Sequence, residues 1–102
     1  MPIIIMIVQD RRGCRIIPAH TPARTGDTVR FSAVNTVVEI NFPGPIKLFT
    51  NSPNQFPIDE NQHVEVQINK EIPYGTYPFS AFCLECNTFA EGGSFGELIV
   101  GP

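Results

Sequence analysis

Short apolar runs separated by turn-forming residues recur along the whole chain. In the clearest of them, residues 63–69, valine and isoleucine occupy every second position, and polar side chains occupy the positions between. Residues 28–34 have the same period of two, with Val29, Phe31 and Ala33 on one side. This period predicts strands that bury one face. On similar grounds we expect extended segments at residues 2–9, 14–27, 37–42, 76–83 and 95–100, and residues 46–50 offer another short apolar piece.

Three segments depart from simple alternation. The run at residues 2–9 is apolar almost throughout, which is typical of a strand buried on both faces. Residues 14–27 contain Pro18 and Pro22, and these prolines restrict the segment to an edge strand or to irregular extended structure. Residues 51–62 are rich in proline, asparagine and acidic side chains, so we expect a loop there.

This pattern predicts an all-β protein, a Greek-key β-sandwich or barrel of seven or eight short strands. No window has the helical period, although residues 86–93 could hold a single helical turn. A chain of 102 residues suffices for one domain, which we expect to span residues 1–102 around one modest core.

The distribution of charge argues against one class of partner. The formal net charge is −3, and five of the seven basic side chains lie within the first 30 residues. They do not form the extended basic surface that nucleic-acid binding requires. We therefore expect no nucleic-acid partner and interpret these charges as ordinary solvated surface.

The first residues, Met-Pro-Ile-Ile-Ile-Met-Ile-Val, are apolar but lack the basic flank and cleavage site of a signal peptide. The run is also too short to cross a membrane, so we expect no membrane association. These features predict a cytoplasmic protein with reduced thiols. The odd number of cysteines, three, likewise argues against a closed disulfide framework.

Cys83 and Cys86, at C-x-x-C spacing, are the chief chemical signal of the chain. Two thiols at this spacing can bind one soft metal ion, as half of a zinc site or as a two-coordinate Cu(I) site. Zinc would need further ligands, for which Cys14, His20 and His63 are the candidates. A second copy of the chain in a homodimer could also complete the site.

Two other interpretations of the same cysteines stay open. A redox pair needs a stabilised thiolate, whereas the neighbours Phe82, Leu84 and Glu85 disfavour the anion, which leaves only a slow reversible disulfide. Alternatively, Cys83 and Cys86 are small, chemically inert core residues, because cysteine is among the most buried residue types.

The connection at residues 42–56 carries three phenylalanines among prolines and asparagines. Exposed on a rigid loop, Phe42, Phe49 and Phe56 would suit the binding of a protein partner. The competing interpretation, which we favour, is that the rings close one end of the core. An enzyme is the least expected class, because two scattered histidines offer no base for a nucleophile.

Three motifs resemble one known family. Residues 26–31 (Gly-Asp-Thr-Val-Arg-Phe), 75–79 (Gly-Thr-Tyr-Pro-Phe) and 96–100 (Gly-Glu-Leu-Ile-Val) look like the corresponding strands of cupredoxins, in the same order. The resemblance spans residues 3–101 and implies the blue-copper fold. In that family two histidines, a cysteine and often a methionine hold one copper ion.

The copper ligands implied by this resemblance are not retained. Val38 stands where the first histidine is expected, Cys86 near the second, and Ser94 at the methionine. The cysteine position falls on Ala81, with Cys83 two residues later on the same face of the strand.

Two hypotheses of function follow. In the first, the chain is a cupredoxin-like protein without a blue-copper site that binds Cu(I) or zinc, or undergoes thiol redox, through Cys83 and Cys86. In the second, it is a non-catalytic interaction module that contacts a protein partner through its loop ends.

Overall fold

The computed structural model describes residues 2–11, 13–84, 88–89 and 96–102. These residues form short strands joined by turns, as the alternating pattern predicts. The strands are β1 (Ile3–Asp10), β2 (Gly13–Ile17), β3 (His20–Arg24), β4 (Thr28–Val34), β5 (Val38–Asn41), β6 (Gln55–Ile58), β7 (His63–Gln67), β8 (Gly75–Cys83), β9 (Thr88–Phe89) and β10 (Gly96–Gly101).

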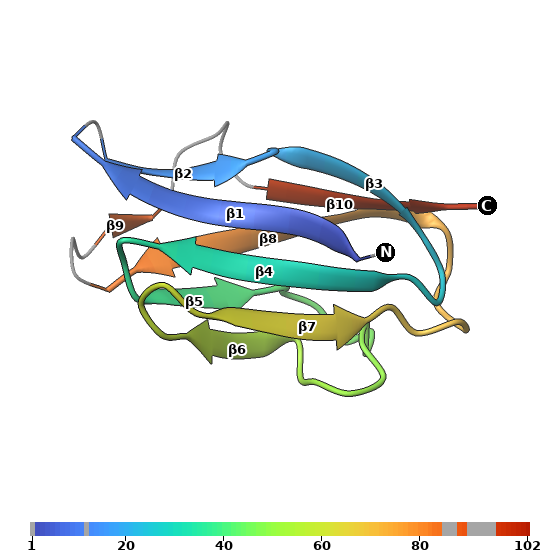
Figure 1. The fold of residues 1–102 in the computed structure, drawn as a ribbon. Coiled ribbons are helices and arrows are strands. Elements are labelled where there is room, and N and C mark those ends of the chain that lie inside the picture. Colours follow the sequence, from blue (N-terminus) through green and yellow to red (C-terminus); the bar gives the residue numbers. More distant parts are fainter. Residues whose placement is uncertain (1, 12, 85–87, 90–95) are drawn as a thin grey trace.

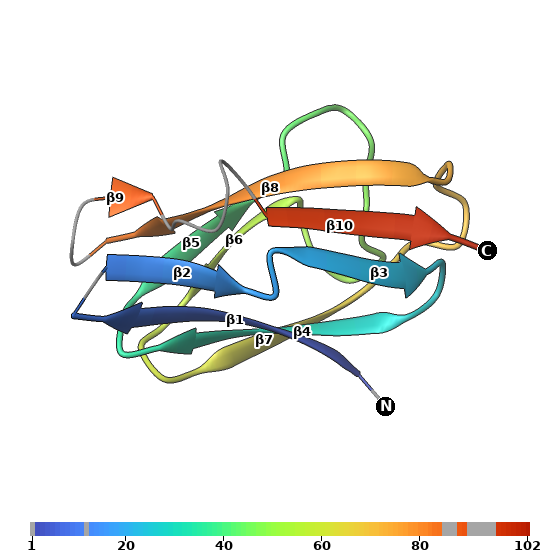
Figure 2. The ribbon, with the colours of Figure 1, turned by 90° about the horizontal axis from the view of Figure 1, so that it is seen from above.

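The strands form two sheets that pack face to face (Figure 1). One sheet has the order β2-β1-β4-β7, and the other has the order β3-β10-β8-β5-β6 with β9 paired to β8. Both sheets are mixed, because β1 pairs with β4 and β3 with β10 in parallel, while the other pairs are antiparallel. Figure 2 shows β2 leading directly into β3, so that the chain passes from one sheet to the other. The predicted all-β sandwich is confirmed.

The core lies between the two sheets and is built from the inward positions of the strands. In β4, Val29, Phe31 and Ala33 are buried, and in β8, Phe79 and Cys83 are buried, as their alternation predicts. Phenylalanine rings fill the centre: the Phe31 and Phe79 ring centroids lie 5.6 Å apart in an edge-to-face arrangement.

The expectation that residues 2–9 are buried on both faces is wrong. Ile5 and Ile7 are fully buried, but Ile4 and Met6 on the opposite side of β1 are 49 % and 37 % exposed. The reason is architectural: in a two-layer sandwich only the inner face of each sheet is covered.

Residues 51–62, expected to be a loop, contain β6. Its side chains alternate, with Phe56 and Ile58 buried against the core and Gln55 and Pro57 exposed. Proline is tolerated here because β6 pairs only with β5 and so forms a sheet edge. Of the prolines in residues 14–27, Pro22 lies in β3, which ends its sheet order, and Pro18 lies in the connection between the edge strands β2 and β3, as predicted for an edge strand or irregular extended structure.

The region proposed as a helical turn contains the short strand β9 instead, and its other residues lie outside the described part of the chain. The described residues include no helix long and apolar enough to span a membrane.

The two ends of the sandwich differ. The turn before β4, the loop between β5 and β6 and the turn between β7 and β8 lie at one end, together with both ends of the drawn chain (Figure 1). We call this the loop end. The last residues of β8 and the strand β9 lie at the opposite end.

Candidate functional site

Cys83 is the last residue of β8 and points into the sandwich. Strand β8 alternates inward and outward from Phe79 onward, so the parity of the chain alone places this thiol inside. In the antiparallel register of β5 and β8, Cys83 lies directly opposite Val38. Both residues are 0 % exposed.

The partner of Cys83 is Cys14, with which it forms a disulfide. Cys14 lies in β2, at the edge of the other sheet, and its Cα atom is 6.8 Å from that of Cys83. The bond therefore ties the two sheets together at the end opposite the loop end. Cys14 is 2 % exposed, so the sulfur pair is closed to solvent.

This disulfide corrects the expectation of reduced, unpaired thiols. The odd cysteine count does not exclude a disulfide, because two of the three cysteines pair and Cys86 is left over. Cys86 lies outside the described residues. Within the described part of the chain, Cys83 has a partner from the opposite sheet rather than from its own C-x-x-C motif.

The described residues at the implied copper positions do not fit a copper ion. Val38 and Ala81 are buried hydrocarbon side chains without a donor atom. The sulfur of Cys83 is already bonded to Cys14. Ser94, the residue at the methionine position, lies outside the described residues.

The two histidines proposed as helper ligands lie on the surface. His20 is on β3, its side chain is 64 % exposed, and its Nδ1 is 2.6 Å from Glu97 Oε1. His63 begins β7 and is exposed, paired in register with Ser32. Across the described residues, no three His, Cys, Asp or Glu side chains converge in a way that could hold a metal ion.

The three phenylalanines of the 42–56 connection are core residues rather than a partner-binding loop. Phe42, Phe49 and Phe56 are 1 %, 0 % and 5 % exposed. Phe42 and Phe49 pack edge-to-face with their ring centroids 5.2 Å apart. The ring centroid of Phe56 lies 5.5 Å from that of Phe31. Burial of large aromatic surface favours this position.

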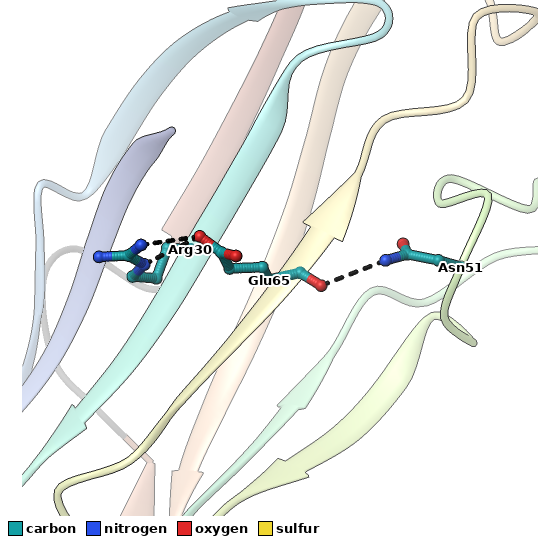
Figure 3. Close-up of polar contacts among 3 residues, drawn as sticks. All are labelled: Arg30, Asn51 and Glu65. Carbon is teal, nitrogen blue, oxygen red and sulfur yellow. Dashed lines mark hydrogen bonds and ion pairs between the residues drawn. The ribbon is translucent and has the colours of Figure 1, made fainter. Parts of the chain in front are cut away.

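A polar arrangement that the sequence did not reveal protects the free edge of β7 (Figure 3). Asn51 accepts a hydrogen bond from the backbone N–H of Gln67 at 2.9 Å and donates one to the backbone oxygen of Glu65 at 3.3 Å. Its side-chain amide thus imitates the peptide group of a neighbouring strand. The Glu65 side chain lies toward β4, where Oε2 accepts from Arg30 Nε and Nη2 at 3.0 and 2.9 Å.

Known protein structures resemble this chain in fold. A purple cupredoxin from Nitrosopumilus maritimus superposes with a TM-score of 0.63 at 14 % identity, covering 97 % of this chain and 99 % of its own. Amicyanin from Paracoccus versutus superposes with a TM-score of 0.57 at 15 % identity, and the match covers 98 % of this chain and 81 % of the amicyanin chain. A Cu(I) amicyanin variant superposes with a TM-score of 0.59 at 14 % identity, and the match covers 95 % of this chain and 81 % of the amicyanin chain.

Comparisons at the level of sequence identify no relative: no family model and no curated protein matches the chain. The structural matches, at identities this low, establish the fold alone.

Proposed function

This chain has the cupredoxin fold, and from this premise we propose that it is an interaction module cross-linked by a disulfide. We also propose that it does not transfer electrons through a copper ion. The observation that supports this is the Cys14–Cys83 bond. It engages the one sulfur that lies opposite Val38, the position at which the family resemblance implies a histidine ligand.

Burial of the disulfide favours a structural role. Reactive cysteines are partly exposed and lie near positive charge, whereas buried ones are inert. Cys14 and Cys83 are 2 % and 0 % exposed, so attack by an external thiol would first require local opening of the sandwich. A stable disulfide also supports a location in an oxidising compartment, whereas the N-terminal residues predict a cytoplasmic protein.

The test is to determine disulfide connectivity and metal content on the same preparation. Non-reducing peptide mapping is expected to recover Cys14 linked to Cys83, with Cys86 alkylated. Metal analysis after expression in medium supplemented with copper and zinc is expected to find far less than one equivalent. One equivalent of either metal that is lost in a Cys83→Ser/Cys86→Ser variant would overturn the proposal.

A second candidate function is thiol redox or soft-metal binding through Cys83 and Cys86. One observation favours the redox function: Cys14, the remaining cysteine of the chain, is already bonded to Cys83. The same bond counts against metal binding, because it occupies the Cys83 sulfur. Attack of the Cys86 thiolate on Cys83 Sγ would form a Cys83–Cys86 bond and release Cys14 as a thiolate. Peptide mapping across a series of glutathione redox buffers separates the two candidates, because this one requires the Cys83–Cys86 linkage to accumulate.

A further inference from the structure

The loop end carries an exposed surface that the core and the disulfide do not use. Ile46, in the loop between β5 and β6, is 40 % exposed, and Tyr74, in the turn before β8, is 61 % exposed. Tyrosine is enriched among the residues that dominate protein interfaces. Tyr74 is also the most exposed large hydrophobic side chain among the described residues.

Next to Ile46 lies a small cavity of about 60 Å³. Ile46 and Tyr77 line it, together with Pro43, Gly44, Pro45 and Leu48. The hydroxyl group of Tyr77 donates a hydrogen bond to the backbone oxygen of Pro73 at 2.5 Å, which joins the cavity wall to the turn that carries Tyr74. The cavity has room for part of one apolar side chain.

Both lysines of the chain belong to this end. Lys47 follows Ile46, and Lys70 lies in the turn before Tyr74. The N–H of Asn69 donates to the backbone oxygen of Leu48 at 2.8 Å, so the two lysine-bearing segments are adjacent. Both lysines are exposed, and within the described part of the chain neither has an ion-pair partner.

The local charge differs in sign from the charge of the whole chain. The cations Arg24, Lys47 and Lys70 at the loop end outnumber the acids Asp27 and Glu71, whereas the net charge of the protein is −3. Asp27 is also engaged, because its Oδ2 accepts the backbone N–H of Arg24 at 2.9 Å. The loop end is thus the complement of an acidic partner.

The loops that carry this surface are held by side-chain amides. Asn54 Oδ1 accepts the N–H of Leu48 at 3.0 Å, and Asn54 Nδ2 donates to the backbone oxygen of Ile46 at 2.6 Å. Asn69 Oδ1 accepts the N–H of Glu71 at 3.1 Å. Such preorganisation lowers the entropic cost of binding.

We propose that the loop end docks an acidic segment of a partner protein. The docking surface consists of Ile46, Lys47, Lys70 and Tyr74, together with the small cavity that Ile46 and Tyr77 line. Part of one apolar side chain of that segment enters the cavity, and the carboxylates of the segment face the two lysines. The inference rests on the proposed function as an interaction module and names the surface and partner chemistry. It also relocates the partner-binding role from the buried phenylalanines of the 42–56 connection to the exposed side chains of the same connection.

The probe for this surface is a labelled twelve-residue peptide of alternating glutamate and leucine, with blocked ends. Two control peptides replace glutamate by lysine, or leucine by serine. Titration into ¹⁵N-labelled protein is expected to shift the amide signals of residues 44–48 and 69–77. The signals of β2 and of the end of β8 are expected to stay in place.

Charge-reversed variants show whether the lysines act locally. Lys47→Glu/Lys70→Glu is expected to weaken binding of the acidic peptide at least tenfold, the equivalent of two modest charge contacts. Tyr74→Ala is expected to weaken binding as well. Arg11→Glu and Arg15→Glu, which together alter net charge equally at exposed cations beside the turn between β1 and β2, form the matched control and should change binding less than about twofold.

Four results would overturn the proposal: equal weakening in the Arg11→Glu/Arg15→Glu control, equal binding of the serine peptide, shifts that map elsewhere, or no shift at millimolar peptide. Self-association through the same residues, detected by sedimentation, would also overturn it by assigning the surface to a second copy. Because connectivity and metal content are measured on the same sample, failure of the docking surface remains distinguishable from failure of the proposed function.

Discussion

Cys14, in an edge strand of one sheet, is bonded to Cys83, the last residue of a strand in the other sheet, across a sequence separation of 69. Edge strand β2 has a single neighbour in its own sheet, β1. The disulfide gives it a second, covalent attachment.

Replacement of this pair by alanine in Cys14→Ala/Cys83→Ala is expected to lower the free energy of unfolding by about 4 kcal/mol, from the loop-closure entropy of a separation this long. Urea unfolding followed by circular dichroism under non-reducing conditions measures the loss. Cys86→Ala is the matched control and should unfold at the wild-type midpoint. A double variant as stable as wild type would contradict the structural role of the bond.

The edge of β7 supplies a second prediction. Asn51→Ala removes both hydrogen bonds to the backbone of Glu65 and Gln67 and leaves that edge open to another strand. We expect faster amide exchange at Gln67, a stability loss of about 1 to 2 kcal/mol, and concentration-dependent self-association in sedimentation. Asn51→Asp keeps the acceptor for Gln67 and should lose only part of this protection. Unchanged exchange at Gln67 in the alanine variant would contradict the assignment.

A third prediction concerns Gly96, which lies opposite Phe79 in the register of β10 and β8. A Cβ atom on Gly96 would overlap the Phe79 ring, with two ring carbons at 2.7 and 2.8 Å. Gly96→Ala is therefore expected to destabilise the protein by about 1 to 3 kcal/mol through overpacking.

Two further variants identify the cause of this loss. Gly101→Ala, in the same strand, has nothing within 4 Å of the added Cβ and should stay within about 0.5 kcal/mol of wild type. Combined with Phe79→Leu, Gly96→Ala should cost less than it does alone. Additive losses in thermal unfolding would rule out the clash with the ring.

The fourth prediction compares two buried threonines. Thr21 Oγ1 is buried without a hydrogen-bond partner, whereas Thr36 Oγ1 donates to the backbone oxygen of Val37 at 3.2 Å. Thr21→Val removes an unsatisfied polar atom, so we expect a gain of about 1 kcal/mol in unfolding free energy. Thr36→Val loses a bond and should destabilise by a similar amount. Chemical denaturation measures both, and a loss at Thr21 would show that its hydroxyl has a partner.

Much of the fold follows from local patterns. The alternation in residues 28–34 and 63–69 predicts both the strand and the buried side, because successive side chains of a strand point to opposite faces. The strand β6 does not follow from the sequence, because the prolines, asparagines and acidic side chains of residues 51–62 predict a loop, although Phe56 and Ile58 alternate as in a strand. Whether a proline lies at a sheet edge depends on which strands pair, and this is not a local property.

The candidate site was harder to predict. The inward direction of Cys83 follows from its parity in β8, but its partner does not. The C-x-x-C spacing indicates Cys86 as the residue that acts with Cys83, whereas the disulfide partner, Cys14, lies in the other sheet. The loop-end surface was equally hidden, since nothing in the sequence indicates that Lys47 and Lys70 lie on adjacent segments.

The sequence by itself determined which side of β4, β7 and β8 is buried and, through three motifs in order, the cupredoxin-like architecture. These properties depend on side-chain period and turn chemistry, which act over a few residues. Only the tertiary structure decided that Cys83 bonds to Cys14, that Ile4 and Met6 are exposed, and that the phenylalanines of the 42–56 connection are buried. Each of these depends on the stacking of one sheet on the other, which brings together residues far apart in the chain.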